Sequence, residues 1–180
     1  MSKLGGWNIK VSTSGMPQKV VTAMAKINSL LGAKYTEVAY LGNQLANGTN
    51  HAVLAEQVVI TGEDTKNVVI VTINEKPETI ETALVGITPI VEGGGKFGGT
   101  NINLTTEIPE DAQQLFNEAT AGFVGSNIKP FAFVGTKVVK GIDYKFIAEV
   151  TAVTLNPTPY IAVVTVNSMD KKLTFEPVLG

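Results

Sequence analysis

Gly5-Gly6-Trp7-Asn8-Ile9, near the start of the chain, returns 93 positions later as Gly98-Gly99-Thr100-Asn101-Ile102. The same offset relates Val71-Thr72-Ile73-Asn74 to Val164-Thr165-Val166-Asn167. Chance agreement between apolar residues would not hold one offset across glycine, asparagine and glutamate positions, so we interpret the chain as a tandem duplication. Further pairs at this offset are Ala39 with Ala132, Gly42 with Gly135, Gly48 with Gly141, and Ala55-Glu56 with Ala148-Glu149.

The duplication predicts two domains of one type within the 180 residues. We place the first domain at residues 1–91 and the second at residues 100–180, joined by a glycine-rich linker at residues 92–99. Glycine-rich segments behave as flexible chain, and each half is long enough to form a small hydrophobic core.

One helix is expected near the start of each half. Pro17 is suited to the first helical position, because its missing N–H has no partner there in any helix. The apolar residues that follow recur at helical spacing in both halves. They are Val20, Met24, Ile27 and Leu31 in the first half, and Ala112, Leu115, Phe116, Ala119 and Phe123 after Pro109 in the second.

The rest of each half reads as strands. Asn47-Gly48 is a strong signal for a tight hairpin between two such runs. Gly62-Glu63-Asp64 predicts a further turn. The resulting order, β-α-β-β-β-β, predicts an α+β fold: two tandem units, each with one helix packed across a four- to five-stranded antiparallel sheet. The strands expected in the first half span residues 6–13, 37–46, 49–61, 67–75 and 79–90.

The composition excludes several kinds of chemistry. The chain has no Cys, no Arg and a single His, and its net charge is −2. It therefore lacks thiol nucleophiles, disulfides and zinc thiolates, and it lacks the basic surface that nucleic acids require. We expect no enzymatic activity, no cofactor and no metal site.

Two weaker signals have structural interpretations. Residues 93–98 match G-x-G-x-x-G by letter, but a strand rather than a helix is expected to follow, so the dinucleotide motif is not formed. His51 has Tyr144 as its repeat partner, which favours a structural ring at this sheet position over a catalytic base. Neither signal supports a catalytic site.

The N-terminal residues Met1-Ser2-Lys3-Leu4 do not begin a signal peptide, because no apolar run follows them. No segment reaches the roughly 18 apolar residues of a membrane span. We expect a cytoplasmic protein without membrane contact.

The predicted first hairpin of each half carries a related segment: Gln44-Leu45-Ala46-Asn47-Gly48 in the first and Lys137-Val138-Val139-Lys140-Gly141 in the second. Together with Gly5-Gly6 and the β-α-β-β order, these segments resemble the cystatin family, whose first hairpin has the form Q-x-V-x-G. The resemblance covers nearly the whole chain as two copies. It implies that each half wraps an antiparallel sheet around one helix.

The resemblance also implies a binding site. In inhibitory cystatins, an N-terminal glycine segment, the first hairpin and a second hairpin carrying Pro-Trp plug the cleft of papain-like cysteine proteases. Pro159-Tyr160 is the nearest equivalent of Pro-Trp in this chain. The candidate partner-binding residues are Gly5, Gly6, Gln44, Leu45, Ala46, Asn47, Gly48, Lys137, Val138, Val139, Lys140, Gly141, Pro159 and Tyr160.

Two functions remain open. The first is a non-enzymatic scaffold that binds a protein partner through its loops or a sheet edge. The valine-rich runs at residues 68–73 and 161–166 are candidates for edge pairing or homo-oligomer formation. The alternative is an inhibitor of papain-type cysteine proteases that acts through the first-hairpin loops.

Overall fold

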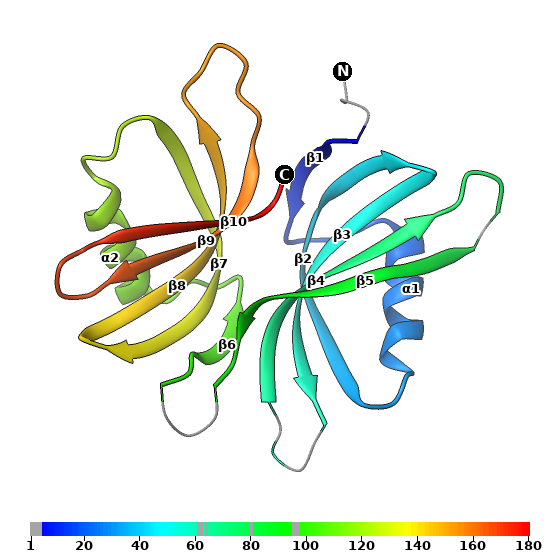
Figure 1. Cartoon of the computed structure of the whole chain (residues 1–180), viewed down its shortest axis with the longest axis horizontal. Coiled ribbons are helices and arrows are strands. Elements are labelled where there is room, and N and C mark those ends of the chain that lie inside the picture. The colour runs from blue at the N-terminus through cyan, green and yellow to red at the C-terminus, as the bar shows by residue number, and fades with distance from the viewer. Residues whose placement is uncertain (1–4, 61–62, 64, 80, 95–97) are drawn as a thin grey trace. The chain divides into compact units, whose positions relative to one another are not determined.

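The computed structural model describes residues 5–60, 63, 65–79, 81–94 and 98–180. The chain divides into two compact units, Met1–Glu92 and Gly93–Gly180 (Figure 1). Residues 1–4, residues 62 and 64 of the predicted turn, and residues 95–97 of the predicted linker lie outside the described residues.

Unit 1 is a five-stranded antiparallel sheet with one short helix. Its strands follow one another in space as they do in sequence, in the order β1-β2-β3-β4-β5. The bounds are β1 Trp7–Ser12, α1 Gln18–Asn28, β2 Ala33–Ala46, β3 Gly48–Val59, β4 Thr65–Glu75 and β5 Thr82–Glu92.

Unit 2 has the same succession of elements. Its sheet runs in the order β10-β9-β8-β7-β6 and is also antiparallel. The bounds are β6 Asn101–Thr105, α2 Glu110–Thr120, β7 Ser126–Val139, β8 Gly141–Ala152, β9 Tyr160–Asn167 and β10 Leu173–Leu179.

The predicted fold class was wrong. Strands account for 58 % of the structure and helices for only 13 %, so the chain is mostly β rather than two α+β cystatin-like units. The physical reason is a difference in length. Each helix has 11 residues, whereas β2 and β7 have 14 each and β3 and β8 have 12. The two antiparallel sheets therefore dominate the architecture.

Each helix begins directly after a proline. Pro17 and Pro109 are the N-cap residues, one position before the first residues of α1 and α2, so the prediction that proline takes the first helical position was off by one residue. The helices end sooner than the apolar spacing suggested. Leu31 follows the end of α1 and is fully exposed, and Phe123 lies beyond α2, where its ring packs against that of Phe175.

One side of each helix packs against its sheet to form a hydrophobic core. In unit 1, Val20, Met24 and Ile27 of α1 meet strand residues such as Val53 and Val71. In unit 2 the core is more aromatic, because the Phe146 ring packs edge-on against those of both Phe116 and Phe133. Burial of these apolar side chains is the main stabilising contribution within each unit.

The strands after the two helices match closely. β2 and β7 have the same length and the same burial pattern, and both contain two irregularities of register at positions 93 residues apart. Gly42 and Gly135 lie at the second irregularity, with φ of +150° and +147°. A side chain at either position would collide with the backbone of the neighbouring strand, at Asn8 or Asn101. Only glycine allows the first strand of each sheet to approach this closely.

The valine-rich runs predicted as pairing edges lie inside the sheets. Residues 68–73 belong to β4, between β3 and β5, and residues 161–166 belong to β9, between β8 and β10. Their main-chain groups already pair on both sides, so the prediction that they offer an edge was wrong.

The outer strands are β1 and β5 in unit 1, and β6 and β10 in unit 2. Each of them has at least one irregularity in its pairing, and β5 and β10 also contain Pro89 and Pro177. Irregular pairing and proline are features that protect an outer strand from pairing with another chain.

Candidate functional site

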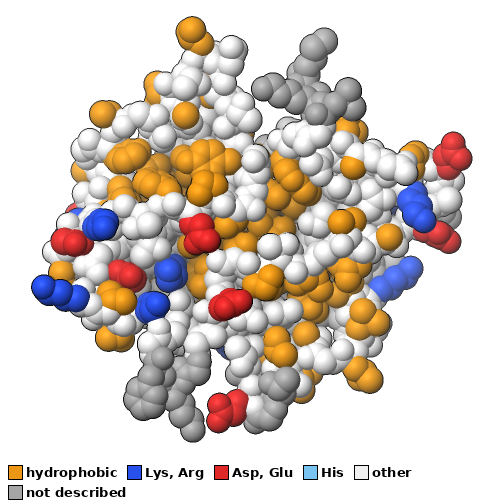
Figure 2. Space-filling view, viewed as in Figure 1, with side chains coloured by type: hydrophobic (Ala, Val, Ile, Leu, Met, Phe, Trp, Pro, Cys, Tyr) orange, Lys and Arg blue, Asp and Glu red, His pale blue; other side chains and the backbone are white. Residues whose placement is uncertain are grey.

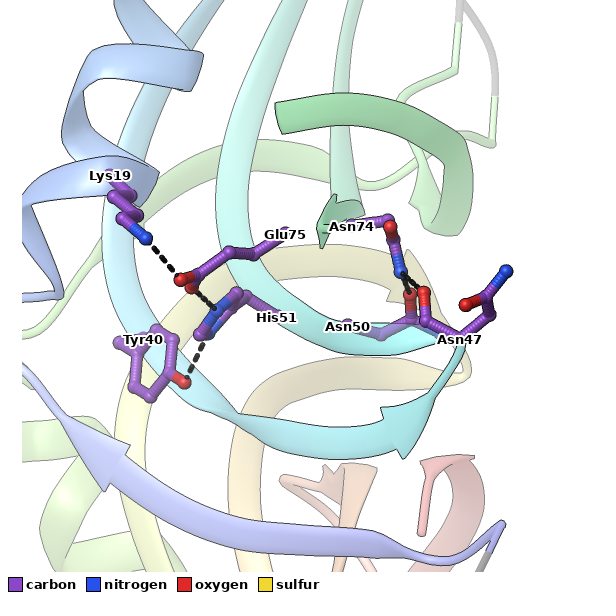
Figure 3. A network of polar contacts seen from close by, with 7 residues as sticks. All are labelled: Lys19, Tyr40, Asn47, Asn50, His51, Asn74 and Glu75. Carbon is purple, nitrogen blue, oxygen red and sulfur yellow. Dashed lines mark hydrogen bonds and ion pairs between the residues drawn. The ribbon is translucent and has the colours of Figure 1, made fainter. Parts of the chain in front are cut away.

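The predicted hairpin loops lie beside a second turn in each unit. We call residues 44–49 with residues 74–76 "tip 1", and residues 137–142 with residues 167–172 "tip 2". In tip 1, the side-chain amide of Asn74 donates to the main-chain carbonyl of Asn47 (3.1 Å) and to Oδ1 of Asn50 (2.8 Å) (Figure 3). In tip 2, Asn167 donates to the carbonyl of Lys140 (3.1 Å) and to Asp143 (2.9 Å). One asparagine per unit therefore fastens the two hairpins together.

Glycine is required at the turn of each first hairpin. Gly48 and Gly141 have φ of +93° and +85°, a conformation that other residues rarely adopt. A side chain at Gly48 would strike the backbone of Glu75 and Lys76, whereas one at Gly141 would meet only the side chains of Met169 and Ser168. Gly48 is therefore under the tighter steric constraint.

In unit 1, a chain of side-chain amides crosses the sheet from tip 1 to the N-terminal glycines. The amide of Asn50 donates to Oε1 of Gln44 (3.0 Å), and that of Gln44 donates to the carbonyl of Gly5 (2.8 Å). Gly6 immediately precedes Trp7, which pairs with Gln44 in the β1–β2 register. Gly5, Gly6, Gln44 and the Asn47-Gly48 turn are thus brought together at one end of unit 1.

The two tips differ in character. Tip 2 exposes Val138, Val139 and Ile142 on its first hairpin and Met169 on the second turn, whereas the large apolar side chain exposed in tip 1 is Leu45. Ser168 joins the two parts of tip 2, since its hydroxyl accepts from the N–H of Ile142 (2.9 Å) and its own N–H donates to the carbonyl of Ile142 (2.8 Å). The backbone beneath the exposed apolar side chains of tip 2 is therefore held by hydrogen bonds between its two turns.

A surface hollow opens beside these side chains. Val139, Lys140 and Met169 form part of its lining, together with Thr165 and Lys172. Charged side chains also gather over the ends of these hairpins, on the face drawn in Figure 2. Tip 2 thus combines exposed apolar groups, lysines and a hollow.

Pro159 and Tyr160 lie elsewhere. Tyr160 pairs with Val150 at the far end of β8, whereas Gly141 of tip 2 is the first residue of that strand. The hairpin that accompanies tip 2 is instead the β9–β10 turn at residues 168–172. The prediction that grouped Pro159-Tyr160 with the loop residues 137–141 was therefore wrong.

Behind tip 1, a second polar network reaches the helix (Figure 3). The only histidine, His51, lies 2.8 Å from the hydroxyl of Tyr40 through Nδ1 and 3.0 Å from Oε2 of Glu75 through Nε2. The other carboxylate oxygen of Glu75 accepts from the ammonium group of Lys19 on α1. His51 and Tyr40 are buried, Glu75 is half-buried and Lys19 is exposed.

The network shifts two pKa values. The hydrogen bond from Lys19, followed by that with His51, lowers the pKa of Glu75 below its usual value of 4.5. Burial raises the pKa of Tyr40 above 10.0, against a smaller lowering by a hydrogen bond with Asn43, and the Glu75 charge adds to the rise. At neutral pH, Glu75 is a carboxylate and Tyr40 a neutral phenol.

Unit 2 has no such network at the matching positions. Phe133 and Tyr144 replace Tyr40 and His51, and their ring centroids lie 6.2 Å apart. Ser168 stands where unit 1 has Glu75 and serves tip 2 instead. Unit 2 folds with two aromatic rings at these positions, so the polar network of unit 1 is not required for the fold. In unit 1, the network takes the place that aromatic packing has in unit 2.

Sequence reasoning missed Asn74, Asn167, Glu75 and Ser168. The matched asparagines were visible, because both belong to the repeated segments that reveal the duplication. A polar residue retained at the same place in two apolar strands indicates a structural hydrogen bond. Glu75 and Ser168 occupy matching positions in the two units, but they are different residue types with different hydrogen-bond partners. Their position therefore gave no such signal.

Within the residues that the structure describes, no cluster of His, Asp and Glu could hold a metal ion. No described helix is long and apolar enough to cross a membrane. No protein-family model matches the chain, and no curated protein sequence matches it either.

Proposed function

We propose that the protein is a non-enzymatic binding module that holds a polypeptide partner at tip 2. The observation that carries this proposal is the grouping of Val138, Val139, Ile142 and Met169 on two adjacent turns. Exposed apolar groups that gather in one place, rimmed by polar residues, are typical of protein–protein contact sites.

The rigidity of tip 2 supports the proposal. Asn167 and Ser168 tie its two turns together through four hydrogen bonds. A surface that is already ordered loses little conformational entropy when it binds. The backbone that carries the contact side chains is therefore held in a nearly fixed arrangement.

The charges of tip 2 favour an acidic partner segment. Lys140 and Lys172 line the hollow beside Val139, with Asp143 and Asp170 as the carboxylates in the same lining. Lys137 lies opposite Asp143 in the strand register. The lining carries two lysines and two aspartates, so the surplus positive charge is that of Lys137. This charge favours encounter with negative groups, while the apolar side chains supply the contact area.

The environment of the sole histidine supports the non-enzymatic part of the proposal. His51 is buried and is fully engaged by Tyr40 and Glu75. Neither His51 nor Tyr40 lines the hollow beside tip 2 or the smaller one formed by Ala23, Ile27 and Leu84. A catalytic base must reach the proton that it removes from the substrate, and His51 has no such access.

Site-specific photo-crosslinking tests the proposal. A photoreactive amino acid replaces Val138 in one variant and its repeat partner Leu45 in a second, and each protein is irradiated in an extract of its source cells. We expect a discrete adduct from position 138 and none from position 45. Excess unlabelled wild type should suppress the adduct, whereas a Val138→Lys, Ile142→Lys double variant should not.

Either of two results would contradict the proposal. Absence of an adduct from position 138 would remove tip 2 as a contact site. Identical adducts from positions 45 and 138 would indicate contact without selectivity for tip 2. Circular dichroism of each variant checks that the sheets are intact.

A further inference from the structure

The opposite end of unit 2 carries a second exposed apolar surface. Val124 in the segment after α2 is 90 % exposed, and Val153 and Leu155 in the loop after β8 are 75 % and 100 % exposed. Phe123, which precedes Val124 in the chain, is 41 % exposed. We call these four residues the "loop end" of unit 2. It is distinct from tip 2, because β8 runs from Gly141 at the tip to Ala152 at this end.

The loop end is held in place by its own contacts. The N–H of Val153 donates to the carbonyl of Gly125 (2.9 Å), which joins the two segments. Gly125 has φ of +109°, and the ring of Phe123 lies 5.6 Å from that of Phe175. In Figure 2, hydrophobic side chains lie on the loop that follows β8, which Figure 1 draws in orange.

The loop end has no charge in its sequence. Residues 119–128 and 150–160 contain no Asp, Glu, Lys, Arg or His. The charged residues that border it are already matched: Glu118 pairs with Lys171 (3.2 Å), and Lys129 lies opposite Glu149 in the strand register. Contact at this surface would therefore bury no unpaired charge.

Unit 1 provides a comparison. Leu31 and Ile60 are the repeat partners of Val124 and Val153, and both are exposed. Ile60 likewise donates its N–H to the carbonyl of Gly32 (2.9 Å). The adjoining turn of unit 1, however, includes Glu63 and is followed by Lys66, so this end is charged where that of unit 2 is neutral.

We propose that the loop end of unit 2 binds the loop end of unit 2 in a second copy of this chain. Symmetric contact of one surface with itself brings identical groups together, so any net charge would repel its own copy. A surface without charge avoids this repulsion and gains from apolar burial alone. The outer strands β6 and β10 have irregular pairing, which disfavours the addition of a strand from a second copy at a sheet edge. The proposed contact is therefore made by side chains.

Sedimentation velocity of the full-length protein over a concentration series tests this proposal. The surface is small compared with a standard interface, so we expect a reversible dimer that dissociates at roughly micromolar concentrations. Sodium chloride should leave the dissociation constant within about twofold, because no charge takes part. Leu155→Lys should raise the dissociation constant by about tenfold or more.

Two matched variants separate this surface from the others. Leu31→Lys, at the charged end of unit 1, and Val138→Lys, in tip 2, should both retain the wild-type dissociation constant. A monomer at every concentration would overturn the proposal. So would a dimer that Leu155→Lys leaves intact, or one that Leu31→Lys or Val138→Lys disrupts. Because Leu155 is fully exposed, its substitution leaves the core unchanged.

Discussion

Asn74 donates its side-chain amide to the main-chain carbonyl of Asn47, 3.1 Å away, and so ties the turn of the first hairpin to the end of β4. We expect Asn74→Ala to destabilise unit 1 by about 1–2 kcal/mol, because two hydrogen bonds are lost. Urea unfolding measures this change. Asn167→Ala should have a larger effect on unit 2, because Oδ1 of Asn167 also accepts from the main-chain N–H groups of Met169 (2.9 Å) and Asp170 (3.4 Å). Asn117→Ala, on the exposed side of α2, should have little effect. Equal stability of Asn74→Ala and wild type would contradict the assigned role.

The two hairpin glycines should differ in their tolerance of alanine. Gly141→Ala should cost about 1–2 kcal/mol for the left-handed backbone, since the flexible side chain of Met169 can move aside. Gly48→Ala should cost more, about 3 kcal/mol, because the backbone at Glu75 cannot yield as easily. Urea unfolding of the two variants tests the order. A larger loss for Gly141→Ala would show that the backbone of β4 is not the constraint.

Unit 2 suggests how the buried network of unit 1 can be replaced. Tyr40→Phe alone should destabilise the protein by about 1–3 kcal/mol, because His51 Nδ1 loses its buried partner. The triple variant Tyr40→Phe, His51→Tyr, Glu75→Ser adopts the unit 2 residues and should recover part of that loss. Thermal unfolding of the single and triple variants measures the coupling. Additive losses from the three substitutions would contradict the idea that these positions act together.

Glu75 should make the stability of unit 1 depend on acidity. Its pKa is lowered in the folded protein, so its contribution is present above pH 4.5 and is lost as the pH falls through the folded value. Glu75→Gln should therefore flatten the fall in urea midpoint between about pH 5 and pH 3. Glu118→Gln, which removes an exposed carboxylate paired with Lys171, is the matched control and should follow the wild type. A fall as steep in Glu75→Gln as in the wild type would exclude this role of Glu75.

Papain should retain its activity in the presence of the protein at micromolar concentrations. The three elements of a cystatin wedge are not assembled around tip 2, because Pro159 and Tyr160 lie at the far end of β8. Titration of papain with the full chain measures this directly. Stoichiometric inhibition that Gly141→Glu or Gly48→Glu abolishes would contradict the expectation.

Local signals in the sequence predicted the elements well. Pro17 and Pro109 precede the two helices, and Asn47-Gly48 forms the turn between β2 and β3. The helix ends were missed because Leu31 and Phe123 continue the apolar spacing although the helices stop at Asn28 and Thr120. Spacing alone cannot distinguish a buried position from an exposed position on a loop.

The fold class and the site were harder to predict. Strands predicted to begin at residues 37 and 67 begin at residues 33 and 65, and such extensions shift the balance toward β structure. The approach of Glu75 to His51 and Lys19 depends on sheet register and on the position of α1, which no local pattern encodes. Pro159-Tyr160 was wrongly chosen as the turn beside residues 137–141. In an antiparallel sheet, alternate turns lie at opposite ends, so the neighbour of this hairpin is the β9–β10 turn at residues 168–172.

The broken outer strands bear on how a duplicated chain folds. Two halves with matching strands risk exchanging them during folding, since a strand from one half could pair in the sheet of the other. The pairing irregularities and the prolines at positions 89 and 177 leave each sheet without a straight, open border on which such an exchange could begin. The same interruptions that limit contact between molecules thus help each copy of the repeat to fold with its own strands.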